Sequence, residues 1–305
     1  MTIKIGISPI SWQNDDLPDL TADYTMDQAL KEAREIGYLG AERGRRMPEG
    51  TEELRTYLAG FDIALCGGWC SGNLLVNDLE TEKASVRQQV EQFAALDAPC
   101  IVYAECSNTV QGDINTPLSK RPKLDRADVT AYARKLGELA KWMADMGQPL
   151  AYHHHMGSFV EDQDDIDWLM EASPPDVHLL YDTGHLQFGG ADVLGTLRKW
   201  SDRVLHVHYK DVRPDVIADM RTRDCSFLEA VIAGGFTVPG DGGIDFEAVT
   251  KILKDVDYSG WIVVEAEQDP AKAPPYDYAK TGFDHIVRLC AQAGLTLDPM
   301  HGKGM

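Results

Sequence analysis

Residues 126–155, RADVTAYARKLGELAKWMADMGQPLAYHHH, contain a helical pattern followed at once by a strand pattern. Apolar residues recur with the helical period over 126–146, and Gly147 is a typical stop signal. QPLAYH (148–153) is a short apolar run that predicts a buried strand, and it leads into three consecutive histidines. A helix that returns directly into a buried strand is the repeating unit of α/β proteins, so the same alternation is expected on both flanks.

The alternation continues over the whole chain. Besides 148–153, we predict strands at 3–8, 38–43, 62–68, 99–105, 178–183, 203–211 and 260–267. Further helices are expected at about 26–36, 52–60, 82–96, 163–172, 191–200, 245–255 and 276–294. Apolar strands that alternate with helices indicate parallel strands buried on both faces. Closure into one (β/α)8 barrel, an α/β fold with residues 1–305 as a single domain, is the economical solution.

Two connections are too long for ordinary links between a strand and a helix. They span residues 107–123 and 211–243. In compact domains such loops usually cover a functional site, so we expect both near the active site. No GxGxxG motif opens the first helix, which disfavours a dinucleotide-binding fold.

The composition argues against several kinds of partner. The chain has 29 basic and 49 acidic residues, a formal net charge of −20. Such a charge repels phosphate backbones and anionic lipid, so we expect neither nucleic acid nor a membrane as a partner. The start, MTIKIGISPISW, lacks the apolar segment of a signal peptide, and the six scattered cysteines have no paired metal-binding spacing. Buried free thiols in the cytoplasm are therefore expected, and assembly into a homo-oligomer is compatible with the sequence.

Ionisable residues collect at the ends of four successive predicted strands, where such barrels carry their active sites. The set comprises His153, His154, His155, Asp182, His185, His206, His208, Lys210, Asp211, Glu265 and Glu267. Alternation along a strand places His153 and His155 on one side and His154 on the other. The favoured metal-binding set is one imidazole of the fifth strand together with Asp182, His208 and Glu265. Such mixed nitrogen and oxygen ligands suit Mn²⁺, Co²⁺, Fe²⁺ or Zn²⁺, and the alternative is a polar network that caps the barrel.

Seven motifs spread along the chain carry a resemblance to a known family. They are ISPISW (7–12), ERGRRMP (42–48), YHHHMGS (152–158), LLYDTGH (179–185), HVHYKDVR (206–213), FTVPGDGGIDF (236–246) and GWIVVEAEQDPAKAPP (260–275). Together they resemble the inosose dehydratases of myo-inositol catabolism, which belong to the xylose isomerase-like sugar isomerase/epimerase barrels. The resemblance spans essentially the whole chain, and VVEAEQDPAKA and TVPGDG are specific to the dehydratase branch.

This resemblance implies a metal-dependent hydro-lyase. The expected substrate is a polyol ketone, 2-keto-myo-inositol (scyllo-inosose), the product is a trihydroxycyclohexane-dione, and the cofactor is Mn²⁺ or Co²⁺. The superfamily's ligands, which run Glu, Asp, His or Gln, and Glu on strands five to eight, fall by position on His153, Asp182, His208 and Glu265. Histidine at the first position departs from the two metal-bound glutamates that superfamily epimerases use, which disfavours the alternative function of a ketose isomerase or epimerase. The choice between His153 and His155 as ligand stays open.

Dehydration next to a ketone needs a base for the α-proton and a route for the departing hydroxyl. Glu267 lies two residues beyond Glu265, on the same side of the predicted strand, and we predict it as the proton-transfer group. Lys210 and His185 are the alternative bases. A metal-dependent phosphodiesterase on the same barrel is a third function to weigh, and the net charge of −20 disfavours it.

Further residues are expected to contact the substrate: Glu42, His155 and Trp12. For Glu42 an ion pair with Arg45 or Arg46 is an alternative that the sequence leaves open. Trp12 and Trp69 stand at strand ends, where an indole could either face a substrate ring or fill the barrel mouth. Asp211 is expected to cap the turn that follows it.

Overall fold

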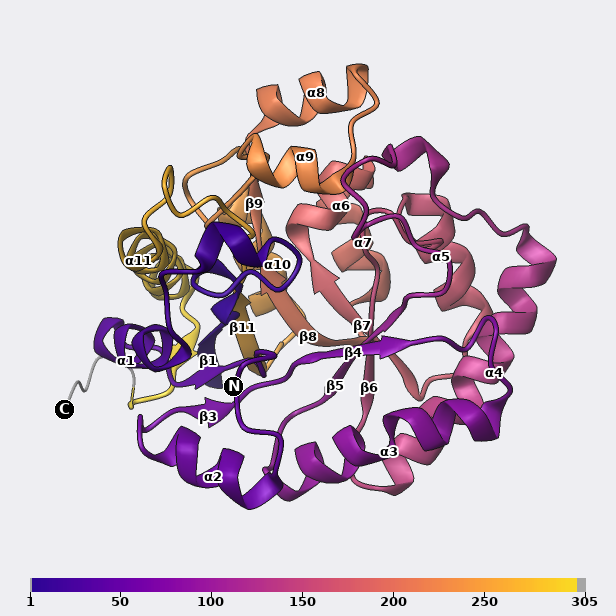
Figure 1. Cartoon of the computed structure of the whole chain (residues 1–305), viewed down its shortest axis with the longest axis horizontal. Coiled ribbons are helices and arrows are strands. Elements are labelled where there is room, and N and C mark those ends of the chain that lie inside the picture. The colour runs from indigo at the N-terminus through magenta and orange to yellow at the C-terminus, as the bar shows by residue number, and fades with distance from the viewer. Residues whose placement is uncertain (1, 301–305) are drawn as a thin grey trace.

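Parallel strands form the centre of the molecule and helices surround them (Figure 1). The computed structural model describes residues 2–300. The central strands are β1 (Thr2–Ile7), β2 (Gly40–Ala41), β3 (Ala64–Leu65), β4 (Trp69–Gly72), β5 (Ile101–Glu105), β6 (Leu150–His153), β7 (Val177–Asp182), β8 (Val204–Tyr209) and β11 (Gly260–Val264). Their order is β3-β2-β1-β11-β8-β7-β6-β5-β4, and neighbours in this order pair in parallel.

β3 and β4 occupy one strand position between them, and this position closes the barrel. β3 pairs with β2, whereas β4, which follows after three residues, pairs with β5. The predicted third strand, 62–68, is therefore broken, because Gly67 has a backbone φ of +144°, which residues other than glycine rarely adopt. With β3 and β4 counted once, the nine central strands give eight parallel positions. The predicted α/β barrel is confirmed.

Helices cover the outside of the barrel. They are α1 (Met26–Ile36), α2 (Thr51–Ala59), α3 (Leu79–Ala95), α4 (Arg126–Asp145), α5 (Gln163–Ala172), α6 (Thr183–Gly189), α7 (Val193–Trp200), α8 (Pro214–Thr222), α9 (Phe227–Ile232), α10 (Phe246–Asp255) and α11 (Pro275–Ala293). In α4, Asp125 caps the first turn by accepting a hydrogen bond from the backbone N–H of Asp128. The buried residues of α4, which include Tyr132, Leu136 and Met143, recur with the helical period. The apolar pattern of the sequence therefore coincides with the face that packs on the barrel. α6, α8 and α9 lie outside the helices that the sequence predicted.

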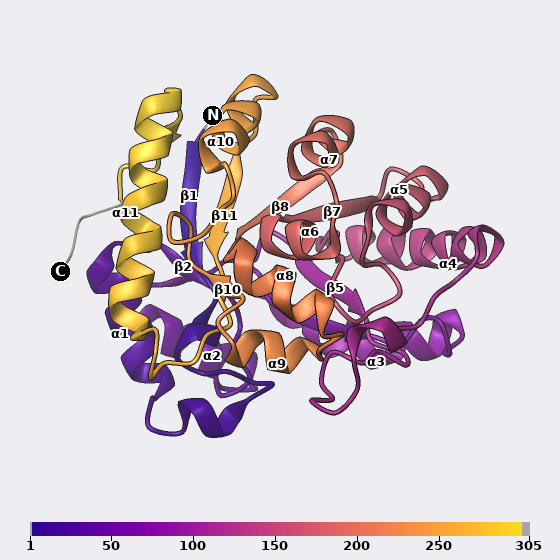
Figure 2. The ribbon, with the colours of Figure 1, turned by 90° about the horizontal axis from the view of Figure 1, so that it is seen from above.

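Residues 211–243 fold into secondary structure, which corrects the expectation of a covering loop. β9 (Asp211–Val212) pairs in antiparallel fashion with β10 (Phe236–Thr237), and α8 and α9 lie between these strands in the chain. An apolar cluster that includes Met156, Phe188, Phe227 and Phe236 joins this insertion to α6. Figure 2 shows α8 and α9 beside β10, and α9 lies at the end of the barrel away from the N-terminus.

The other connections contain short elements. The chain after β1 forms the 3₁₀ helices η1 (Pro9–Ser11) and η2 (Pro18–Thr21), and residues 107–123 contain η3 (Leu118–Lys120). β12 (Thr296–Leu297) pairs with β1. All six cysteines are free, and the five other than Cys106 are buried, as the sequence predicted. Within residues 2–300, none of the helices combines the length and the apolar character needed to cross a membrane.

Candidate active site and metal centre

A cavity of about 530 Å³ lies at the carboxyl ends of the barrel strands. This volume suits a small organic substrate. Its wall includes residues that follow β1 and β2, part of the loop 109–113, and side chains at strand ends. The members at or just beyond the carboxyl ends of strands are Glu42, His153, His155, His208, Glu265 and Glu267, and Trp69 of β4 joins them. The loop 107–123 therefore covers the site as predicted, whereas no described residue of 211–243 lies on this wall.

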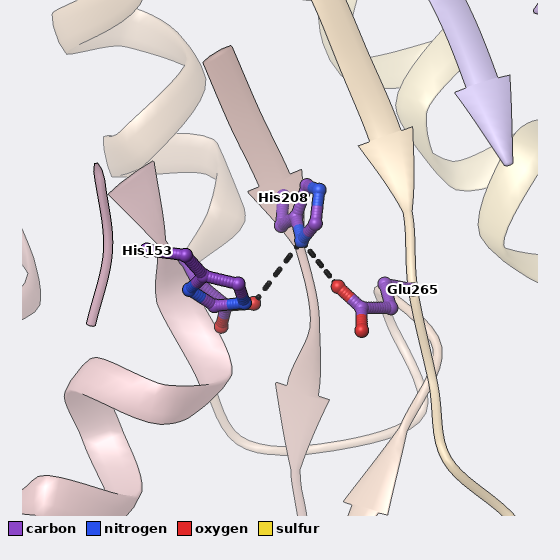
Figure 3. Close-up of side chains that lie close together, drawn as sticks. His153, His208 and Glu265 are labelled. Carbon is purple, nitrogen blue, oxygen red and sulfur yellow. Dashed lines mark ion pairs between the residues drawn. The ribbon is translucent and has the colours of Figure 1, made fainter. Parts of the chain in front are cut away.

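Four side chains from neighbouring strands converge at this cavity, and three of them, His153, His208 and Glu265, line it. His153 is the last residue of β6, Asp182 is the last of β7, His208 lies in β8, and Glu265 directly follows β11. One potential ligand atom from each lies within 4.8 Å of the others. Figure 3 shows His208 between His153 and Glu265, with its ring directed toward the Glu265 carboxylate. The structure thus brings together all four residues of the predicted metal centre.

The atoms that face one another in this group have no hydrogen bonds to the rest of the described protein, and Nδ1 of His208 forms ion pairs within the group, with Glu265 and, at 3.4 Å, with Asp182. The facing atoms are Nδ1 of His153, Oδ2 of Asp182, Nδ1 of His208 and Oε2 of Glu265. Buried polar atoms without hydrogen-bond partners are costly, so a convergent set of them indicates a site for a ligand. Two imidazole nitrogens and two carboxylate oxygens form the donor set of a divalent transition metal. The residues present therefore fit such a cation.

The electrostatics of the group agree with this donor set. Burial lowers the pKa of His153 well below its usual range, which keeps the ring neutral and its lone pair available. Burial raises the pKa of Glu265, but the charges of Lys210 and His208 outweigh this and hold the pKa well below its usual range. Glu265 is therefore an ionised carboxylate, as a metal ligand must be.

The geometry separates His153 from His155. Nδ1 of His155 lies 2.8 Å from the backbone oxygen of Met156, so this nitrogen donates a hydrogen bond. The remaining potential ligand atom of His155 groups with His185 and Glu267, whereas His153 groups with Asp182, His208 and Glu265. Both imidazoles line the cavity, as strand alternation predicted, but they face different clusters.

A matched pair of substitutions tests this assignment. We expect His153→Ala to weaken divalent-metal binding at least ~10-fold. Removal of a group that only hydrogen-bonds to a metal ligand already weakens binding by that factor, and removal of a ligand should weaken it at least as much. His155→Ala should leave the metal dissociation constant within about threefold, a change of only ~0.7 kcal/mol. Titration of the two purified variants with Mn²⁺ measures the difference. The reverse pattern would make His155 the ligand.

Lys210 lies in the cluster that contains His185 and Glu267. Its Nζ lies 2.7 Å from Oε2 of Glu267, 3.3 Å from Oε1 of Glu265 and 3.0 Å from Nε2 of His185. An ammonium group has three N–H donors, and two of them serve the two carboxylates. The cation of this cluster is therefore a lysine side chain, which links the two carboxylates and sits over the ring of Phe236 at 4.9 Å.

Lys210 and His185 are fully buried, and the structure does not bring them to the cavity wall. The expectation that either side chain reaches the substrate is corrected, because both lie behind Glu267 in the packing. Glu267 does line the cavity. Burial raises the pKa of Glu267 to about 7, although the charge of Lys210 opposes the shift.

Glu42 has partners other than the predicted arginines. Its Oε1 lies 2.9 Å from Nε2 of His208 and 3.2 Å from Nε2 of His206. Burial raises the pKa of Glu42, but the two imidazoles outweigh this and hold it at about 2. Glu42 lines the cavity and also touches a residue of the metal centre.

Trp12 and Trp69 lie in different environments. Trp12 is fully buried, and its Nε1 donates a hydrogen bond to Oε2 of Glu32 at 2.6 Å, so it belongs to the core and not to the substrate wall. Trp69 lines the cavity and has its ring 5.6 Å from that of His153 and 5.4 Å from that of His155. Trp69 is therefore the indole that faces the site. Asp211 accepts hydrogen bonds from four backbone N–H groups, including that of Val212, which agrees with its predicted capping role.

Several cavity residues escaped the sequence prediction. They are Gln13, Asp15, Asp16, Arg43, Ser71, Cys106, Thr109, Gln111 and Asp113. Arg43 lies in the motif ERGRRMP and Ser71 lies in β4, and the others are residues of connections. Their direction toward the cavity follows from the path of the loops, for which periodicity gives no signal.

Fold and site together define an (β/α)8-barrel enzyme with a candidate metal centre at the carboxyl ends of its strands. The family model for the xylose isomerase-like TIM barrel matches residues 30–300. The rhizopine catabolism protein MocC of Rhizobium meliloti is 43% identical over 97% of this chain and 91% of its own length. An inosose dehydratase of Clostridium tetani is 41% identical over 95% of this chain and 98% of its own length. The chain therefore belongs to the xylose isomerase-like TIM barrel family and, within it, to the inosose dehydratase branch.

Solved structures repeat the fold at lower identity. The IOLI protein, solved with a binding zinc atom, has a TM-score of 0.61 and 16% identity, over 95% of this chain and 97% of its own. A likeness of this kind supports the barrel architecture alone.

Proposed function

We propose that this protein eliminates water from 2-keto-myo-inositol (scyllo-inosose) to give a trihydroxycyclohexane-1,2-dione, with Mn²⁺ or Co²⁺ as cofactor. The observation that carries the proposal is the convergence of four ligand atoms, which have no hydrogen bonds outside their own group, directly beside a cavity-facing carboxylate, Glu267. Relatives about 40% identical that are named inosose dehydratase support the choice of reaction. His153, Asp182, His208 and Glu265 would hold the cation.

The elimination removes a proton from the carbon next to the ketone and a hydroxyl group from the following carbon. The electron pair of the broken C–H bond forms the carbon–carbon double bond, and the hydroxyl leaves with a proton as water. The enol that results becomes the dione by moving one proton. A divalent cation, when bound, polarises the ketone oxygen and so acidifies the neighbouring C–H bond.

Glu267 is the residue that we assign to proton removal. It faces the cavity beside Glu265, and its Oε2 lies 2.7 Å from the Lys210 ammonium, which holds the carboxylate in place. Lys210 thereby acts as a positioning residue, and His185 restrains its Nζ from a third direction at 3.0 Å. A positioned base of this kind contributes on the order of 10²–10⁴-fold to rate.

The cavity offers further groups for the polyol ring. His155 and Glu42 lie on its wall and are assigned to the hydroxyl side of the substrate. The indole of Trp69 supplies an apolar surface for one ring face. A location in the cytoplasm and a homo-oligomeric assembly stay predictions from the sequence.

The arrangement disfavours the alternative function of a ketose epimerase. An epimerase needs one group to remove a proton and another to return it on the opposite face. In this chain three glutamates near the metal centre face the cavity. Glu265 and Glu267 come from the end of one strand and share Lys210, whereas Glu42 is held by His206 and His208. The place of the second acid is taken by His153, a neutral imidazole. This supports elimination over epimerisation.

The direct test is addition of scyllo-inosose to the Mn²⁺-loaded protein. We expect the absorbance of a conjugated enol-dione to appear and one water to be lost from the product by mass spectrometry. A product of unchanged mass would indicate an isomerase or epimerase and would overturn the proposal. The metal-free protein with the same substrate is the control.

Chelation gives a second test. We expect EDTA to abolish activity, and Mn²⁺ or Co²⁺ to restore it at least ~10-fold better than Mg²⁺, because Mg²⁺ accepts imidazole nitrogen poorly. Initial rates after dialysis and metal addition measure this. Full activity in the chelator, with metal content verified as removed, would contradict the proposed centre.

A further inference from the structure

Glu42 connects the end of β2 to the opposite side of the barrel. It follows β2, yet its Oε1 lies within hydrogen-bonding distance of two imidazoles of β8, His206 and His208. These partners are 164 and 166 residues away in the sequence. All three side chains are buried, so the contacts are shielded from water.

The backbone leaves space for this arrangement. A Cβ atom built on Gly67 would lie 3.2 Å from Oε1 of Glu42 and 3.2 Å from Nε2 of His206. Those contacts are tighter than ordinary van der Waals contact, and the φ of +144° at Gly67 also disfavours other residues. The break between β3 and β4 therefore provides the room in which Glu42 and His206 meet.

The two nitrogens of His208 face different groups. Nδ1 faces Glu265 and lies 3.4 Å from Oδ2 of Asp182, while Nε2 lies 2.9 Å from Glu42. A carboxylate has only acceptor atoms, so Nε2 must carry the hydrogen in this contact. A cation that replaced the proton on Nδ1 would leave a neutral ring whose Nδ1 lone pair points at it and at the other candidate ligands.

We propose that Glu42 is a positioning residue of the metal centre: it selects the tautomer and orientation in which His208 binds the cation through Nδ1. The inference rests on the proposed metal centre and extends it by one residue. His206 holds the same oxygen from a second direction, which restricts the carboxylate to the orientation that His208 needs. Contact with substrate hydroxyls is then a secondary property of Glu42.

The first experiment needs no substitution. Long-range ¹H–¹⁵N spectra of the protein loaded with diamagnetic Zn²⁺ report which nitrogen of His208 is protonated, with assignment by the spectrum of His208→Gln. We expect a protonated Nε2 and a metal-bound Nδ1. A protonated Nδ1 with Nε2 on the metal would overturn the proposal, and absence of Zn²⁺ binding would instead overturn the metal centre itself.

The second experiment measures affinity. We expect Glu42→Leu to raise the Mn²⁺ dissociation constant by about 10–100-fold, the usual effect of losing a partner of a metal-bound histidine. Glu42→Gln, whose amide oxygen still accepts a hydrogen bond, should fall between Glu42→Leu and the unchanged protein. Glu161→Gln removes a buried carboxyl group outside the cavity wall, and should leave the constant unchanged.

The outcomes separate the possible roles of Glu42. If Glu42→Leu raises KM for the substrate while its Mn²⁺ dissociation constant stays unchanged, Glu42 binds substrate and the proposal is wrong. A lower Tm with an unchanged Mn²⁺ constant would show a role in folding alone, and would also overturn it. If the leucine variant does not fold, the glutamine variant and the Zn²⁺ spectra decide.

Discussion

We expect Glu267→Gln to lower kcat at least ~10²-fold, the usual contribution of a positioned base, while KM and metal content change little. Glutamine keeps the size of the side chain and can still accept a hydrogen bond from Lys210, but it cannot take a proton from carbon. The metal ligands stay in place, because Glu267 lies outside the group of His153, Asp182, His208 and Glu265. Steady-state kinetics and metal analysis of the same preparation measure both quantities.

Glu161→Gln is a matched control for this variant. Glu161 is another carboxyl group whose pKa burial raises to about 7, and it lies outside the cavity wall, in an ion pair with Arg121 at 3.2 Å. We expect Glu161→Gln to leave kcat within about twofold of the value for the unchanged protein, a difference of only ~0.4 kcal/mol in activation free energy. A Glu267→Gln variant with an unchanged kcat and a raised KM would make Glu267 a binding residue, and the base would have to be another cavity group.

The second large effect is expected at Asp182. Asp182→Ala should weaken divalent-metal binding at least ~10²-fold, because it removes a charged ligand. This factor is the largest usual loss of affinity when a group that hydrogen-bonds to a ligand is removed. Asp182 is fully buried, and its Oδ2 has no hydrogen bond. Activity should fall with the bound metal and return in part at high Mn²⁺ concentration. Calorimetric titration with Mn²⁺ and metal analysis after gel filtration measure the affinity.

Asp182 has a second role that must be separated from the first. Its Oδ1 accepts a hydrogen bond from the backbone N–H of His185 at 2.8 Å and so caps α6. Loss of such a cap costs about 1 kcal/mol. Asp182→Asn keeps the capping oxygen, and Asp192→Ala removes the corresponding cap of α7 away from the cavity. We expect the first to lose metal and the second to retain it; equal metal content in all three variants would exclude Asp182 as a ligand.

The sequence by itself determined the architecture, because the signals that specify it are local. The apolar stripe of α4 and the cap at Asp125 depend on residues a few positions apart, and the helices at 26–36 and 163–172 have the predicted bounds. Eight such units of helix and apolar strand leave few ways to bury the strands on both faces. The same periodicity placed the ionisable residues at one end of the barrel.

Only the tertiary structure decided which strand segments pair and which neighbours the residues after the strands contact. The split of the third strand at Gly67 and the antiparallel pair β9–β10 arise from packing between distant segments, for which a single stretch carries no signal. Likewise, Trp12 and Trp69 both follow strands in the sequence, but a contact with Glu32 holds the first in the core.

The site shows the same division. Residue types and spacing were enough to predict that Asp182, His208, Glu265 and an imidazole of the fifth strand lie close together, since strand ends in a parallel barrel meet at one edge. They could not choose between His153 and His155, because a period of two makes these equivalent. Nor could they show that Lys210 is buried between two carboxylates or that Glu42 orients His208, because those contacts join side chains of different strands: β8 and its neighbour β11 in the first case, β2 and β8 in the second. Local pattern therefore determined where the chemistry lies, and contacts between distant strands decided which atom does what.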